Sequence, residues 1–161
     1  MKIVRRYLVV SVDKGVREVV RTEAGLAERV HYAAEAQFTE HQGYEEAAAS
    51  VETGRFDAAV VDLVLPRAEG LQRHEDHLSY GLDLALALRQ RGVPVVLCLS
   101  LWTGEEGASA ADDKREQPRV SMHDWILRIA DRFEIACVRR PFGGRSLLDA
   151  VHALVANRRT P

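Results

Sequence analysis

The sequence predicts one α/β domain in which a parallel β-sheet is covered by helices on both faces. Four apolar runs have the length of buried strands, at residues 7–10, 58–61, 94–99 and 135–138. Segments with helical period lie between these runs, and parallel strands need crossovers of that kind. Strand and helix therefore alternate along the chain, which is typical of a doubly wound, three-layer sandwich.

Length, charge and cysteine usage agree with one domain that works inside the cell. The chain has 161 residues, of which 47% are hydrophobic and 29% charged, enough for a single core. A net charge of -2 argues against direct nucleic-acid binding. Cys98 and Cys137 lie inside apolar runs, as expected of small buried residues in a reducing compartment. No run approaches the roughly 18 apolar residues of a membrane span, so we expect a cytoplasmic protein without membrane contacts.

The first half of the chain supplies three strands and two helices. The first strand, residues 7–10, is followed by a helix with apolar positions at Val16, Val19, Val20 and Ala27. Residues 30–38 alternate between apolar and polar side chains, which predicts a half-exposed edge strand. A second helix carries Tyr44, Ala47, Ala48 and Val51 on one side, and the third strand, 58–61, ends at Asp62.

The second half repeats the alternation. A helix over Leu82–Leu88 stops at Gly92, and the fourth strand follows. Ser121 is the predicted N-cap of a helix with an apolar stripe from Met122 to Phe133. The last helix carries Leu147, Leu148, Val151, Leu154 and Val155. Residues 67–80 and 103–119 are predicted insertions into the single domain, which covers 1–161.

Polar residues follow each of the apolar runs. Ser11 and Asp13 come after the run at 7–10, Asp62 after 58–61, Ser100 after 94–99 and Arg140 after 135–138. Because the carboxyl ends of parallel strands meet at one edge of a sheet, we expect these carboxylates, hydroxyls and the guanidinium to lie close together there. Ligands and chemistry in open α/β sheets collect at that edge.

Three segments, FDAAVVDLVLP (56–66), GLDLALALRQRGVPVVLCLS (81–100) and ACVRRPF (136–142), resemble the receiver domain of two-component response regulators. The resemblance implies a flavodoxin-like sheet of strand order 2-1-3-4-5. It implies that Asp62 accepts a phosphoryl group from a histidine kinase or phosphotransfer protein. It further implies Mg²⁺ bound by Asp13 and Asp62, a hydroxyl switch at Ser100, and a phosphate-binding cation at Arg140 before a cis-proline, Pro141.

The sequence departs from the family pattern at three of these places. Where the family has two adjacent acids after the first strand, only Asp13 remains, which weakens the metal site. Arg140 replaces a lysine. Its planar guanidinium binds carboxylate or phosphate bidentately, whereas a lysine ammonium is a compact point charge. Cys137 stands where many receivers carry an aromatic switch residue. These departures keep open a pseudo-receiver, in which Arg140 pairs with Asp62 and no phosphorylation occurs.

In either case we expect a protein that changes its binding partner, with no enzymatic activity beyond its own phosphorylation. The resemblance implies contacts with a downstream protein, or a homodimer, through the surface around 122–133 and 147–155. The chain has no GxGxxG after its first strand, no P-loop and no nucleophile elbow. A flavin- or nucleotide-binding module on the same fold is a more distant alternative. His74 and His77 form either a metal site or a solvated insertion.

Overall fold

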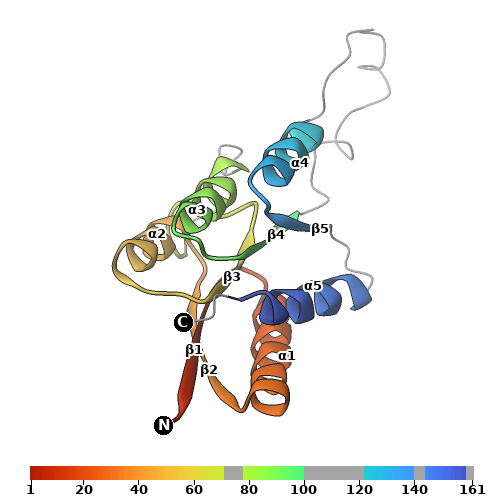
Figure 1. The fold of residues 1–161 in the computed structure, drawn as a ribbon. Coiled ribbons are helices and arrows are strands. Elements are labelled where there is room, and N and C mark those ends of the chain that lie inside the picture. Colours follow the sequence, from red (N-terminus) through yellow and green to blue (C-terminus); the bar gives the residue numbers. More distant parts are fainter. Residues whose placement is uncertain (71–77, 100–121, 140–143, 159–161) are drawn as a thin grey trace, which may run out of the picture.

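A five-stranded parallel sheet with helices on both faces makes up the fold, which is shown by a computed structural model (Figure 1). The structure describes residues 1–70, 78–99, 122–139 and 144–158. The strands are β1 (Ile3–Val10), β2 (Ala34–His41), β3 (Ala58–Asp62), β4 (Val95–Leu99) and β5 (Ala136–Arg139). The helices are α1 (Lys14–Tyr32), α2 (Tyr44–Thr53), α3 (Leu78–Gln90), α4 (Met122–Arg132) and α5 (Gly144–Ala156). The strand order β2-β1-β3-β4-β5 confirms the predicted topology.

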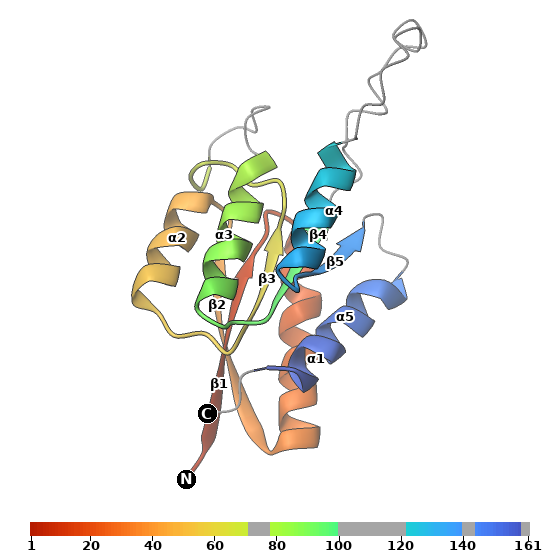
Figure 2. The same cartoon turned by 45° about the horizontal axis from the view of Figure 1, so that its top comes forward.

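The helices divide between the two faces of the sheet. Figure 2 shows α1 and α5 on one face and α2, α3 and α4 on the other. Each face has its own apolar core, one built around Leu8, Val61 and Leu97 and the other around Tyr7, Val9 and Val60. Every residue of β3 and β4 is buried, as expected of central strands covered on both sides.

The predicted boundary of the second strand was wrong. Val30, His31 and Tyr32 belong to the last turn of α1, and β2 begins only at Ala34. Ala33 ends the helix in the left-handed conformation, with a φ of 49°, although glycine is the usual residue there. The alternation over 30–32 was therefore coincidental, and Val30 is 62% exposed. The prediction that this strand lies at an edge of the sheet is confirmed.

Other sequence-based boundaries agree with the structure or need a small correction. Helix α3 starts at Leu78, so residues 78–80 belong to that helix and not to the predicted 67–80 insertion. Tyr80, in this first turn, stacks on Tyr44 of α2 with ring centroids 4.6 Å apart. Gly92 has a positive φ of 74°, in keeping with its predicted role as the stop after α3. Residues 103–119 lie outside the described residues.

Both cysteines lie in strands, as predicted. Cys98 of β4 is buried, Cys137 of β5 is partly buried, and neither is in a disulfide. No helix among the described residues is long and apolar enough to cross a bilayer.

Candidate functional site at the carboxyl edge of the sheet

Asp62 ends β3, the central strand of the sheet, and its side chain is almost fully enclosed. The residue is 6% exposed. It pairs in register with Cys98 of β4, and the N–H of the following residue, Leu63, donates to the Cys98 carbonyl at 2.9 Å. The apolar run 58–61 therefore carries one carboxylate to the edge of the core, where the sequence predicted it.

The hydroxyl of Ser11, the residue that follows β1, donates to this carboxylate. Its Oγ lies 2.6 Å from Asp62 Oδ2. Ser11 is fully buried, and its own N–H donates to the His41 carbonyl of β2 at 3.0 Å. A hydrogen bond between a neutral donor and a carboxylate is short and strong, so the contact ties the ends of β1 and β3 together.

Asp13 makes a contact that the sequence analysis did not predict. It is the N-cap of α1, and its Oδ1 accepts from the Gly15 N–H at 2.8 Å. A side-chain cap of this kind satisfies one of the free N–H groups at a helix start. Asp13 also adjoins the site, since its backbone N–H contacts Ser11 Oγ at 3.1 Å. Mg²⁺ binding through Asp13 and Asp62 stays a prediction.

Hydrogen bonds already use one oxygen of each carboxylate that is predicted to bind Mg²⁺. Ser11 occupies Asp62 Oδ2, and the Gly15 N–H occupies Asp13 Oδ1. Among the described residues, no three His, Cys, Asp or Glu side chains are grouped so that they would hold a metal ion. Mg²⁺ can bind through one or two carboxylates plus water, so it would use the other carboxylate oxygens or displace these hydrogen bonds.

Two helices, α3 and α1, border the surroundings of Asp62. A Cβ on Gly81, in the first turns of α3, would lie 2.0 Å from the Asp62 carbonyl oxygen. Only glycine therefore lets α3 approach the end of β3 this closely. On the other side, Arg17 of α1 donates from Nη1 to the Ser11 carbonyl at 2.7 Å. Helix α3 thus contacts the end of β3, and α1 contacts the residue that follows β1.

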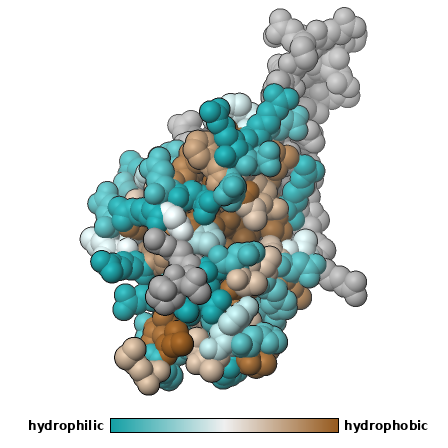
Figure 3. Space-filling view, in the orientation of Figure 1, coloured by the Kyte–Doolittle hydropathy of each residue, from teal (hydrophilic) through white to brown (hydrophobic). Residues whose placement is uncertain are grey.

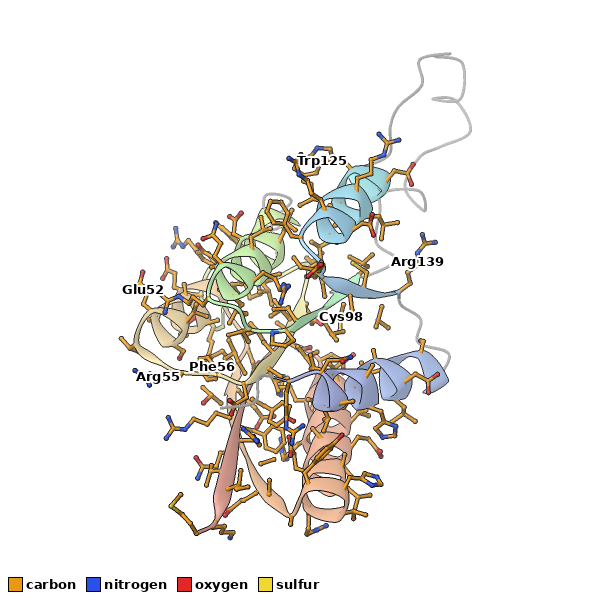
Figure 4. The ribbon with its side chains drawn as sticks, in the orientation of Figure 1. Glu52, Arg55, Phe56, Cys98, Trp125 and Arg139 are labelled. Atoms are coloured by element: carbon orange, nitrogen blue, oxygen red, sulfur yellow. The ribbon has the colours of Figure 1, made fainter. Side chains whose placement is uncertain are left out.

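The remaining predicted site residues, Ser100, Arg140 and Pro141, lie outside the described residues. The strands that precede them, β4 and β5, end at Leu99 and Arg139, which pair with each other in the sheet. Figure 4 shows Cys98 on β4 near the centre of the molecule and Arg139 at the outer edge of β5. His74 and His77 are likewise outside the described residues.

Cys137 occupies the β5 position that the resemblance assigns to an aromatic switch. It pairs with Leu97, and its Sγ contacts the Ile135 carbonyl at 3.8 Å. Burial raises the pKa of its thiol from 9.0 to about 11, against a smaller lowering by Arg139. A thiol of this kind is a weak nucleophile at neutral pH, so Cys137 acts as a small apolar residue here.

Ser11 is the site residue that sequence reasoning missed. The sequence placed it at the correct edge but gave it no role, because a serine after a strand is most simply a turn residue. Its partner lies 51 positions away. The available signal was that Ser11 directly follows the first strand, in the stretch where the resemblance implies two adjacent acids.

Solved receiver domains share this fold. One is the non-phosphorylated HemR receiver domain from Leptospira biflexa, with a TM-score of 0.59 and 18% identity over 98% of both chains. The receiver domain of a Luxo repressor protein from Vibrio parahaemolyticus gives a TM-score of 0.57 at 11% identity, covering 97% of this chain and 92% of that one. That of NtrX from Brucella abortus gives 0.56 at 15% identity, covering 94% and 98%.

The fold is therefore that of response-regulator receiver domains, over nearly the whole chain. No family model and no curated protein matches the sequence. At these identities the likeness establishes the architecture, and the function has to be argued from the site.

Proposed function

We propose that the chain is a receiver-type signalling domain whose protein contacts depend on the state of Asp62, its phosphoacceptor. The observation that carries this proposal is the place of Asp62 at the carboxyl end of the central strand of a 2-1-3-4-5 sheet. That edge is where chemistry collects in open α/β sheets.

In the proposed reaction, a carboxylate oxygen of Asp62 forms a bond to phosphorus while the bond from phosphorus to the donor's leaving group breaks. The donor would be a histidine kinase or a phosphotransfer protein. Since Asp62 is 6% exposed, its carboxylate has to become more accessible before transfer. The Ser11 hydroxyl, now 2.6 Å from Asp62, would then be placed to donate to a phosphoryl oxygen.

Intact mass spectrometry tests this proposal directly. The folded protein is incubated with acetyl phosphate and Mg²⁺, and we expect the mass of one phosphoryl group to be added. The gain should disappear in Asp62→Asn. It should persist in Asp83→Asn, a matched control because Asp83 is an exposed acid on α3. No gain in the wild-type protein, shown to be folded by circular dichroism, would contradict phosphorylation.

The Ser11 contact favours a second candidate, a pseudo-receiver that binds partners without being phosphorylated. In this form the Ser11 hydroxyl donates to Asp62, close to the stretch where the resemblance implies two adjacent acids and only Asp13 remains. The predicted pairing of Arg140 with Asp62 belongs to this candidate and lies outside the described residues.

The variant Ser11→Asp separates the two candidates. With a second carboxylate beside Asp62, binding of a divalent cation would be favoured, because the two negative charges repel each other when no cation is bound. If the domain is a pseudo-receiver, the wild-type protein gains no mass and Ser11→Asp gains it with Mg²⁺. If it is an active receiver, the wild-type protein is itself labelled.

The proposed surface for partner exchange is the predicted one, formed by α4, β5 and α5. Trp125 on α4 is 51% exposed and projects away from the sheet (Figure 4). Phe133, just after α4, is 44% exposed. Large aromatic side chains are enriched at the centres of protein interfaces, which supports a downstream protein or a second copy as the partner. Trp125→Ala should weaken either contact, measured by light scattering for the homodimer.

A further inference from the structure

The outer edge of β2 presents backbone groups that no strand among the described residues uses. β2 is an edge strand, and all eight of its residues pair with β1 on the other side. The His41 carbonyl accepts from the Ser11 N–H, so His41 points its backbone groups toward β1. Backbone direction alternates along a strand, so Ala34, Ala36 and Phe38 point their N–H and carbonyl groups outward. An open edge of this kind is a template for another strand.

A groove runs along this edge between β2 and α1. Its volume is about 760 Å³. Arg21, Thr22, Gly25, Leu26 and Arg29 of α1 line one side, and Ala33 to Ala36 line the other together with Lys2. Gly25 and the alanines are small, which leaves room for a backbone to approach. A Cβ on Gly25 would meet nothing closer than Phe38 at 3.9 Å.

The charge of the groove is mainly positive. Lys2, Arg21 and Arg29 line it against one acid, Glu35. Lys2 pairs with Glu35, and Arg21 holds both carboxylate oxygens of Glu40 at 2.9 and 3.1 Å. Arg29 is exposed and makes no side-chain hydrogen bond or ion pair with any of the described residues. An anionic partner would therefore find an uncommitted guanidinium.

The end of the sheet beside the groove is prominent and partly apolar. Residues 3–6 of β1 pair with β2 but not with β3, so a two-stranded ribbon extends below the rest of the sheet next to the C-terminal half of α1 (Figure 1). Figure 3 shows apolar surface at this lower end. Leu26, which lines the groove, is 45% exposed. A partner segment would thus meet apolar as well as cationic surface.

We propose that this groove binds an extended, acidic segment of another protein, which adds to β2 as a sixth strand. Its main chain would pair with the outward groups of Ala34, Ala36 and Phe38, as in other cases of strand addition. Arg21 and Arg29 are eight residues apart on α1, which corresponds to about 12 Å along the helix. Side chains at positions i and i+4 of a strand are about 13 Å apart and lie on one face. Acidic residues at that spacing match the two arginines.

This proposal does not depend on phosphorylation of Asp62, which lies at the opposite end of the strands. The probe is a short fluorescein-labelled peptide of alternating valine and glutamate, and binding is followed by fluorescence anisotropy. Two control peptides have lysine in place of glutamate, or proline in place of the central valines. We expect only the first peptide to bind, more tightly at low salt, because exposed charges are screened at higher ionic strength.

Protein variants locate the site. Arg29→Glu turns an attraction into a repulsion and should weaken binding about tenfold. Arg128→Glu makes the same change at an exposed arginine on α4 and should leave the affinity within about twofold. Equal weakening by both variants would overturn the proposal, since it would indicate a general charge effect.

Amide hydrogen exchange distinguishes strand addition from loose electrostatic binding. Bound peptide should slow exchange at Ala34, Ala36 and Phe38, whose N–H groups point outward. Binding that leaves these amides unprotected, or that tolerates the proline peptide, would overturn the proposal. Protection that appears without peptide and grows with protein concentration would also overturn it, and would identify a second copy of the chain as the occupant.

Discussion

A buried ion pair joins α1 to the segment that follows α5, at the end of the sheet remote from Asp62. Glu28 is fully buried, and Arg158 Nε lies 2.6 Å from its Oε1, with the Arg158 side chain 5% exposed. The Tyr7 hydroxyl of β1 donates to the same oxygen at 2.5 Å. Arg158 also donates to the Val155 carbonyl at 2.7 Å and lies 4.0 Å above the Tyr32 ring.

The informative perturbation is Arg158→Met, which keeps an apolar side chain in place but removes the charge. Losing one partner of a buried ion pair costs about 3–5 kcal/mol, because the other charge stays buried without compensation. Tyr7 continues to donate to Glu28, so we expect the lower end, about 3 kcal/mol. For a domain of this size that corresponds to a fall in Tm of about 6–12 °C.

Urea and thermal unfolding of three variants test this reasoning. Glu28→Gln combined with Arg158→Met removes both charges and should be more stable than Arg158→Met alone. Arg89→Met is the control, since Arg89 pairs with Glu134 at 3.1 Å but the Glu134 side chain is 84% exposed. It should cost less than about 1 kcal/mol. A similarly small loss for Arg158→Met would refute the proposed importance of the buried pair.

Three further predictions concern other parts of the fold. Gly81→Ala should lower the free energy of unfolding by about 1–3 kcal/mol in urea, because the new Cβ would lie 2.0 Å from the Asp62 carbonyl oxygen. Gly25→Ala is the comparison: its Cβ has room, so this variant should be neutral or more stable by up to about 1 kcal/mol. Ala33→Gly should stabilise by about 0.5–1 kcal/mol, since φ is 49° there; a loss in thermal melts would contradict this. The folded-state pKa of Cys137 is raised to about 11, so the protonated thiol's contribution to folding stability is complete below pH 9 and lost as the pH rises toward 11. Alkylation of Cys137 by iodoacetamide should therefore be slow at pH 8, and rapid labelling of the folded protein would disagree.

The sequence predicted the layers well because the central strands are continuous apolar runs, and the strand order followed from the resemblance to receiver domains. The run at 58–61 has no alternative to a buried strand, and it delivers Asp62 to the edge of the sheet. The end of α1 was harder to predict. No glycine or asparagine marks the helix stop at Ala33, and tertiary contacts hold Tyr32 beneath Arg158.

The polar contacts were not predictable for a different reason. Glu28 lies on the buried stripe of α1 with Val20, Ala24 and Ala27, where a charged residue is unexpected. Its presence is explained by Tyr7, 21 positions earlier, and by Arg158, 130 positions later in the chain. The Ser11–Asp62 contact likewise joins residues 51 positions apart. A single sequence gives the types of such residues but not which of them meet.

β5 is less firmly held than α1, β1 and α5, which bears on where a conformational change at Asp62 would travel. At the remote end, the Glu28–Arg158 pair joins α1 and β1 to the segment after α5, and His152 of α5 contacts Glu23 of α1 at 3.2 Å. We therefore expect α1, β1 and α5 to move as one unit. β5 has only four residues, and just one of them is buried. A conformational change at Asp62 should therefore alter the protein surface at β5 and α4. Hydrogen exchange with and without a phosphoryl analogue would show it as altered protection in β5 and α4 but not in α1, and the reverse pattern would contradict this route.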